Sequence, residues 1–148
     1  MPQLTEVRKL REETGAGVME CKRALEEAKG DLRRAAEIVR ERGYAKAEKK
    51  SERVAGSGLI VAYVHNDRIG VLVELRCETD FVARADAFRE LGKNIAMQVA
   101  ATGVETVEAL LAEEYIKDAS KTIGDLIAEA VARMGENTLV RRFIRYAI

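Results

Sequence analysis

The first 43 residues place hydrophobic side chains three or four positions apart, which is the spacing of helices that bury one face. Glycine interrupts this pattern in the segment 14–17 and again at Gly30, so the pattern predicts three short helices. Thr5 and Asp31 are suited to cap the first and third helices, and Gly15 is suited to the left-handed conformation that follows a helix end. The hydrophobic stripes consist of Val7, Leu10, Val18, Met19, Cys21, Ala24, Leu25, Ala28, Leu32, Ala35, Ala36 and Val39.

The pattern changes after Gly43, which we expect to end the third helix. Residues 44–55 are mostly Ala, Glu, Lys and Arg with few hydrophobic positions, which is typical of a solvated helical linker. The sequence Gly-Ser-Gly at 56–58 then marks a boundary.

Beyond this boundary the hydrophobic residues follow a period of two, which indicates β-strands. Segments 59–65 and 69–77, separated by a turn signal at 66–68, predict an antiparallel hairpin. Strand 59–64 is hydrophobic on both faces, and such a sheet must be covered on both sides. The helices expected later in the chain cover only one face. We therefore expect the other face to pair with a second copy in a twofold dimer.

Helical spacing returns after the hairpin. Thr79 or Asp80 is placed to cap a helix that we expect to reach about Ala101, and a weak helix is expected within 104–114.

The last part of the chain contains one more helix and one more strand. Thr122 and Asp125 have the spacing of a capping box. The helix that follows is expected to stop at Gly135, and residues 139–148 are predicted to form a third strand. The sequence therefore predicts an α+β fold. An N-terminal three-helix module and a helical linker precede a three-stranded antiparallel sheet packed with helices.

Composition agrees with a folded chain, because 47% of the 148 residues are hydrophobic and 34% are charged. Twenty-five basic residues balance twenty-five acidic ones. A neutral protein gains little from counterion release, so nucleic-acid binding is disfavoured. No run approaches about 18 consecutive hydrophobic residues, so no membrane association is expected. We expect a cytoplasmic protein with reduced thiols.

No residue pattern points to an active site, a cofactor or a bound metal. His65 beside the hairpin turn has the chemistry of a general base, but a surface turn residue is the preferred interpretation. Cys21 and Cys77 lie far apart in hydrophobic stripes, so core packing is expected of them. One histidine and two separated cysteines cannot assemble a metal site from soft ligands.

Two further features each have a structural and a functional interpretation. Basic residues on the last strand could contact phosphates, but protection of an exposed strand against edge pairing is favoured; they are Arg141, Arg142 and Arg145. Phe81, in the first turn of its helix, is suited to staple that helix onto the sheet. An aromatic residue displayed at such a junction is also suited to enter a partner's pocket.

Three stretches occur in a recognisable order. They are Leu10–Leu25 (LREETGAGVMECKRAL), Glu78–Arg84 (ETDFVAR), and Gly135–Asn137 leading to Arg141–Phe143. In sequence and order they resemble the elongation factor Ts family, and together they extend over most of the chain. Val18 stands where the family often has Met, and Ala85 where it often has Asn. The chain resembles the short, dimeric members and is shorter than they are in the region 102–121.

The resemblance implies a guanine nucleotide exchange factor that binds elongation factor Tu in its GDP-bound and nucleotide-free forms. Such a protein acts by binding and is not an enzyme. The resemblance implies that residues 1–42 fold like a ubiquitin-associated domain. Together with the linker and boundary read from composition, it divides the chain into this module (1–42), a helical linker (43–55) and a core and dimerisation domain (56–148). The segment that it assigns to dislodging the partner's Mg²⁺ is Thr79, Asp80, Phe81 and Val82. The residues that it assigns to N-terminal partner contacts are Arg11, Val18 and Met19.

Two other classes of function are weighed against this one. An adaptor could bind ubiquitin-like partners through the N-terminal module, and binding tests with ubiquitin and with nucleotide-loaded Tu would separate the two. An oxidoreductase or hydrolase would use Cys77 or His65, and insensitivity to thiol alkylation would remove that hypothesis.

Overall fold

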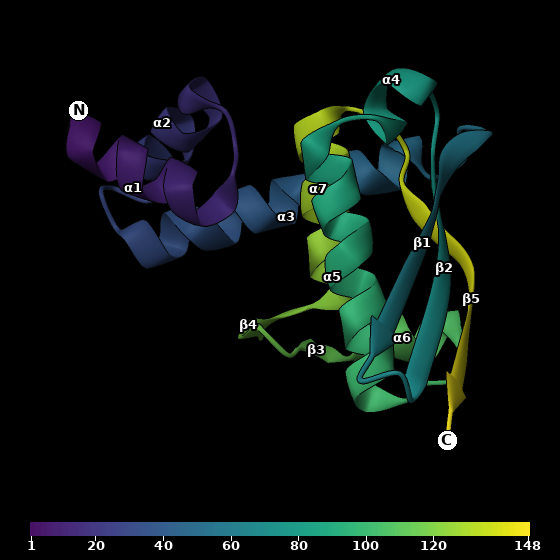
Figure 1. Ribbon diagram of the computed structural model, residues 1–148. Coiled ribbons are helices and arrows are strands. Elements are labelled where there is room, and N and C mark those ends of the chain that lie inside the picture. The colour runs from purple at the N-terminus through teal and green to yellow at the C-terminus, as the bar shows by residue number, and fades with distance from the viewer.

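The computed structural model describes residues 1–148 and contains two hydrophobic clusters. The smaller cluster lies among three N-terminal helices, α1 (Leu4–Thr14), α2 (Val18–Glu27) and α3 (Leu32–Lys50). The larger cluster lies between a sheet and the helices of the C-terminal part (Figure 1). The smaller cluster consists of Val7, Leu10, Cys21, Ala24, Leu25, Ala35, Ile38 and Val39.

Most helix ends of the N-terminal part follow the predictions. Gly15 has a φ of 71° and ends α1, and the Asp31 side chain caps α3 by accepting a backbone N–H at 3.1 Å. Thr5 does not cap α1, because the cap position is Gln3. The Gln3 N–H donates to the carboxylate of Glu6 at 3.1 Å. This acidic residue, three positions after the cap, explains why the helix begins earlier than predicted.

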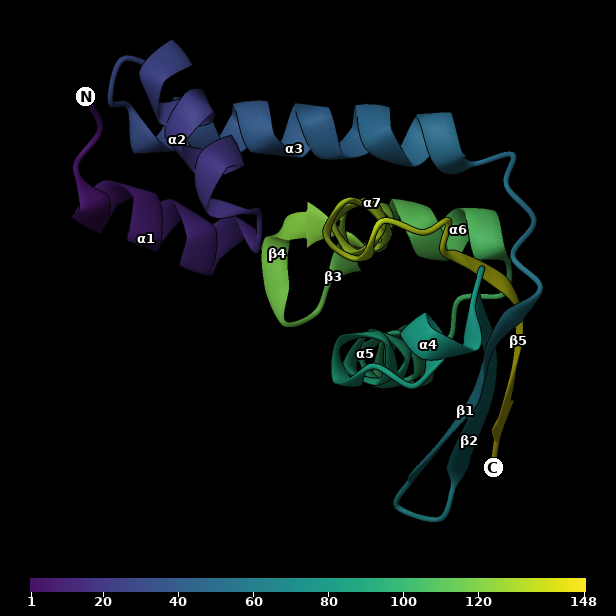
Figure 2. The ribbon, with the colours of Figure 1, turned by 90° about the horizontal axis from the view of Figure 1, so that it is seen from above.

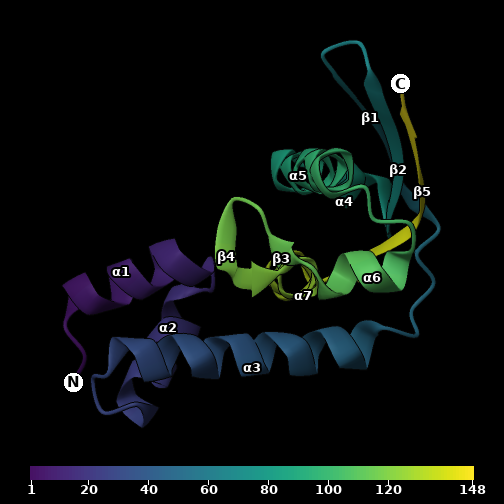
Figure 3. The same ribbon diagram turned by 90° about the horizontal axis from the view of Figure 1, so that it is seen from below.

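The prediction that Gly43 ends the third helix is wrong. Helix α3 continues to Lys50 through strong helix formers. It also packs along α7 (Ile123–Met134), where the Tyr44 hydroxyl donates to Asp125. These contacts outweigh the roughly 1 kcal/mol that glycine costs inside a helix. As a result, α3 runs from the N-terminal helices past α7 (Figures 2 and 3).

The hairpin and the third strand are confirmed. Strands β1 (Ser57–His65), β2 (Ile69–Cys77) and β5 (Leu139–Ala147) form an antiparallel sheet in the order β1-β2-β5. Asn66 and Asp67 both adopt positive φ in the hairpin turn, a conformation that these two residue types tolerate well.

Helices cover one face of this sheet. Helix α5 (Asp86–Thr102) approaches β1 so closely that a Cβ on Gly92 would stand 2.7 Å from a methyl carbon of Val61. The opposite face has no helix on it (Figure 2). The large hydrophobic residues exposed there are Ile60, Val64, Leu72, Ile144 and Tyr146. The chain's own helices therefore leave one hydrophobic face uncovered.

The single helix predicted from residue 80 to about 101 is divided in two. Helix α4 (Asp80–Ala83) ends at Arg84, and Ala85 is extended, with a ψ of 140°, before α5 begins. At about 100° per residue, a straight helix would point Val82 away from the stripe that contains Phe88. The break lets both side chains pack in the larger cluster.

A small hairpin in the region 102–121 was not predicted. Helix α6 (Val107–Ala112) lies within the expected weak helix and is followed by β3 (Glu114–Tyr115) and β4 (Asp118–Thr122). The buried side chain of Gln98 donates to the Glu114 carbonyl at 3.0 Å and accepts the Ile116 N–H at 2.9 Å. This tertiary contact has no signature in the local sequence.

The last predicted helix is confirmed at both ends. Thr122 and Asp125 form the capping box of α7, and Gly135 ends the helix with a φ of 78°. No helix of the chain combines the length and hydrophobicity that crossing a membrane requires.

Candidate functional site

The segment Thr79–Val82 forms the junction between β2 and α4, at one end of the sheet (Figure 1). The Thr79 hydroxyl accepts the Val82 N–H at 3.3 Å, so Thr79 rather than Asp80 caps α4. Val82 and Ala83 are buried in the larger cluster, whereas Phe81 is 87% exposed. The interpretation of Phe81 as a staple against the sheet is therefore wrong, because its ring is in solvent.

Polar contacts on two sides hold this junction. On one side, the carboxylate of Asp80 accepts the hydroxyl of Ser57 at the start of β1. On the other side, the carboxylate of Glu136 accepts the backbone N–H groups of Glu78 and Thr79 at 3.1 and 3.0 Å. It also accepts the Thr79 hydroxyl at 2.7 Å. The short α4 is thus tied to β1 and to the segment that follows α7.

The residues assigned to N-terminal contacts lie around the turn between α1 and α2. Arg11 is exposed in the last turn of α1, and its carbonyl accepts the Gly15 N–H at 2.8 Å. Val18 and Met19 continue the hydrophobic spacing of α2 but are 47% and 56% exposed. They lie on the N-terminal helices and not beside α4, so the candidate residues form two separate surfaces (Figure 1).

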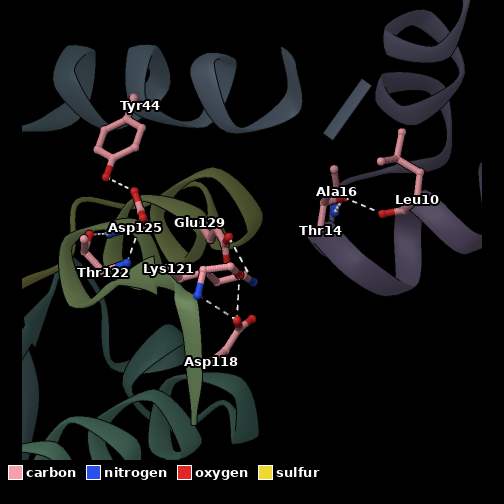
Figure 4. A network of polar contacts seen from close by, with 10 residues as sticks. Leu10, Thr14, Ala16, Tyr44, Asp118, Lys121, Thr122, Asp125 and Glu129 are labelled. Atoms are coloured by element: carbon pink, nitrogen blue, oxygen red, sulfur yellow. Dashed lines mark hydrogen bonds and ion pairs between the residues drawn. The ribbon is translucent and has the colours of Figure 1, made fainter. Parts of the chain in front are cut away.

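A cleft of about 440 Å³ separates the α1–α2 turn from α7. Gly15 lines it at a φ of 71°, a left-handed conformation that favours glycine, and the guanidinium of the exposed Arg133 lies directly against it. Beside it, the Tyr44 hydroxyl donates to Asp125, which also accepts the Thr122 N–H at 2.8 Å (Figure 4).

The polar groups of this cleft perturb each other. Burial by itself raises the pKa of Asp125, but hydrogen bonds from Thr122 and Tyr44 outweigh it and hold the pKa below its ordinary value. Burial, followed by the bond to Asp125, raises the pKa of Tyr44 to about 12. Lys121 pairs with Glu129 at 3.2 Å. The Tyr44–Asp125 bond joins α3 to α7, and the Lys121–Glu129 pair joins β4 to α7, so the first of these contacts helps to fix where the N-terminal helices lie relative to the sheet.

The other candidate residues have structural roles. His65 is exposed at the hairpin turn and contacts the Tyr63 hydroxyl at 3.0 Å. Cys21 and Cys77 are fully buried, and burial raises the pKa of both thiols, which makes them poor nucleophiles. Of the basic residues on the edge strand, Arg142 donates to Glu74 at 3.0 Å and Arg145 to the Ala100 carbonyl at 3.3 Å.

Sequence reasoning missed the contact of Glu136 with the Thr79 junction and the contact of Tyr44 with Asp125. The first depends on the register of β2 and β5, in which Arg76 lies opposite Leu139 and Glu136 is brought beside the end of β2. The second depends on how α3 crosses α7, so neither contact has a signal in the local sequence.

Known proteins of one family are similar to this chain in sequence. The family model described as "Elongation factor TS" matches residues 78–148. Elongation factor Ts of Nostoc sp. is 48% identical over 143 residues, which cover 96% of this chain and 45% of the relative. Elongation factor Ts of Thermodesulfovibrio yellowstonii is 40% identical over 186 aligned positions, which cover 96% of this chain and 94% of the relative. Elongation factor Ts of Coprothermobacter proteolyticus is 42% identical over 188 aligned positions, which cover 96% of this chain and 95% of the relative.

These relatives differ in length from the chain. It spans less than half of the Nostoc protein and nearly all of the other two. The alignments with those two are longer than the 148 residues present here, so these relatives contain residues that this chain lacks. With this identity over almost their whole length, the chain belongs to the elongation factor Ts family of translation elongation factors.

Proposed function

We propose that this chain binds elongation factor Tu, in its GDP-bound and nucleotide-free forms, and promotes the release of GDP by disturbing the Mg²⁺ and phosphate site. The observation that carries the proposal is the exposure of Phe81, 87%, on a helical turn tied down on both sides. An exposed aromatic ring on a fixed support is suited to enter a pocket. No covalent bond is made or broken, so the chain acts by binding and not as an enzyme.

The mechanism is differential binding. An exchange factor must bind the nucleotide-free partner more tightly than the nucleotide-bound one, and linkage makes nucleotide and factor weaken each other equally. Mg²⁺ bridges the nucleotide phosphates and the protein groups around them. Phe81 enters between helices that support this ion, and Asp80 fixes the approach by hydrogen bonding. Burying one Phe contributes roughly 1.5–3 kcal/mol, or about 10- to 150-fold.

The free energy of burying Phe81 alone is too small to accelerate GDP release strongly, so further contacts with the partner are needed. We assign anchoring contacts to Arg11, Val18 and Met19 on the N-terminal helices. The separate hydrophobic cluster of these helices supports the division into a ubiquitin-associated-like module (1–42), a linker (43–55) and a core domain (56–148). Because α3 crosses from the first of these units into the second, the linker begins inside a helix.

We also propose that two copies associate through the uncovered face of the sheet. Five large hydrophobic residues are exposed on this face, and burial of such a surface is the main driving force of association. Two sheets facing each other about a twofold axis would bury both copies of the face at once. The proposal places the protein in the cytoplasm, where translation takes place, with no direct contact to nucleic acid or membrane.

The test is release of labelled GDP from elongation factor Tu in the presence of the chain. The expected result is a release rate that rises with chain concentration and saturates. A variant that lacks the Phe81 ring is expected to reach a much lower plateau. An unchanged rate at every concentration of the unaltered chain would refute the proposal. Binding to ubiquitin instead of Tu would favour the adaptor hypothesis.

A further inference from the structure

Helix α4 cannot fix the direction of Phe81 by itself. It has only four residues, and a helix of this length is not stable in isolation. Its internal support is one capping bond from Val82 and the carbonyl contacts of a single turn. Val82 and Ala83 anchor one side of the turn in the larger cluster, so the rest of its orientation must be set by groups outside the turn.

Glu136 makes three hydrogen bonds to the two residues that lead into this turn. One of its carboxylate oxygens accepts two backbone N–H groups, those of Glu78 and Thr79, at 3.1 and 3.0 Å. The other oxygen accepts the Thr79 hydroxyl at 2.7 Å. Hydrogen bonds to a charged acceptor are about twice as strong as neutral ones. The Thr79 hydroxyl donates its proton to Glu136. The lone pairs of the Thr79 oxygen are therefore available to accept the Val82 N–H.

The segment that contains Glu136 is itself held firmly. It follows Gly135, which ends α7, and precedes β5. The next residue, Asn137, is buried, and its N–H donates back to the Glu78 carboxylate at 2.8 Å. Each of the two segments thus offers a carboxylate to the backbone of the other. The Asn137 side chain also donates to the Arg53 carbonyl at 2.8 Å, which ties the chain after α3 to the same point.

We propose that Glu136 is a positioning residue for Phe81. Its carboxylate holds the backbone at Glu78 and Thr79 so that α4 forms and the Cα–Cβ bond of Phe81 points in one direction before the partner is met. A backbone that is already ordered loses less entropy on binding than a mobile one. The inference deepens the proposed function and rests on it for the effect on GDP release.

Amide hydrogen exchange of the free chain, measured by NMR, tests the holding role directly. In Glu136→Ala, the N–H groups of Glu78 and Thr79 are expected to exchange about tenfold faster or more, while that of Val73 in the middle of β2 keeps its rate. Glu136→Gln retains an amide oxygen that accepts the backbone N–H groups. Its exchange rates at Glu78 and Thr79 should therefore lie between those of the unaltered chain and those of Glu136→Ala. Glu105→Ala, which removes an exposed carboxylate that has no hydrogen bond in the structure, is the charge-matched control.

GDP release from elongation factor Tu gives the second readout. Release is expected to slow about tenfold in Glu136→Ala, to recover in part in Glu136→Gln and to stay unchanged in Glu105→Ala. Unaltered exchange at Glu78 and Thr79, or release at the unaltered rate despite faster exchange, would overturn the positioning role. Failure of the proposed function gives a different result from failure of the positioning role. In that case even the unaltered chain would not accelerate GDP release from elongation factor Tu, whatever its amide exchange rates. If Glu136→Ala does not fold, the same comparisons are decided with Glu136→Gln.

Discussion

Replacing Phe81 with alanine separates the two interpretations of this side chain. Its ring is 87% exposed and contributes little to either hydrophobic cluster. Surface substitutions of this kind usually change the free energy of unfolding by less than about 0.5 kcal/mol. For a chain of this size the melting temperature should therefore fall by about 2 °C at most. Loss of the ring from the partner's pocket should slow GDP release by about 10- to 150-fold.

Two control substitutions make the comparison quantitative. Phe88 is fully buried in the larger cluster, and Phe88→Ala should cost about 3–5 kcal/mol of stability. Its melting temperature should fall by about 6–20 °C. Val54 is 86% exposed and lies outside both candidate surfaces, so Val54→Ala should affect neither quantity.

The assay pairs thermal unfolding with release of fluorescent GDP from elongation factor Tu at matched concentrations of folded protein. The reasoning predicts that Phe81→Ala resembles Val54→Ala in stability and differs from it in release. Normal release together with a large fall in melting temperature would refute the role given to Phe81, because that result is expected only of a ring packed in the chain's own core.

Three other perturbations address the remaining contacts. A fragment that starts at Gly56 retains the larger cluster, so it should fold but accelerate GDP release from elongation factor Tu only weakly. Acceleration equal to that of the full chain would contradict the anchoring role of the N-terminal helices. Leu72→Asp places a charge in the centre of the uncovered sheet face and should convert a dimer to a monomer in sedimentation; a monomeric unaltered chain at micromolar concentration would contradict the dimer. The Tyr44–Asp125 contact should lose strength at both extremes of pH. The lowered pKa of Asp125 makes its contribution complete above the ordinary value of 3.8 and lost as pH falls through the lower folded value. The raised pKa of Tyr44 makes its contribution complete below pH 10.0 and lost as pH rises through about 12. Unfolding measured across pH should show both losses, and the alkaline one should be smaller in Tyr44→Phe, because the raised pKa values of Tyr115, Cys21 and Cys77 contribute to it independently.

Elements that depend on local pattern were predictable from the sequence. The hairpin follows from a period of two on either side of a turn, and α7 follows from its capping box and Gly135. The errors occur where distant residues decide. Gly43 remains helical because α3 packs on α7, and the helix breaks at Ala85 because Val82 and Phe88 must reach the same core.

The candidate site shows the same division. The family resemblance identified the Thr79–Val82 segment, but a residue in the first turn of a helix can face either the sheet or solvent. The choice depends on which neighbours fill the core. Val82 and Ala83 do so here, and the break at Ala85 turns α4 so that Phe81 is left outside. No local pattern specifies that break, so the exposure of Phe81 had to come from the structure.

The two candidate surfaces are held on one continuous support, and this has an energetic consequence. Tyr44 joins α3 to α7, and Asn137 joins the chain after α3 to the segment that holds the Phe81 turn. In the proposed binding mode, contact of the N-terminal surface with the partner would confine Phe81 near its target, so its insertion would be an intramolecular step. The modest free energy of one aromatic ring is then added to that of the anchoring contacts without a second loss of translational freedom. Weakening the Tyr44 contact or the Asn137 contacts should therefore lower the affinity that is gained from carrying both surfaces on one support, while leaving each surface intact.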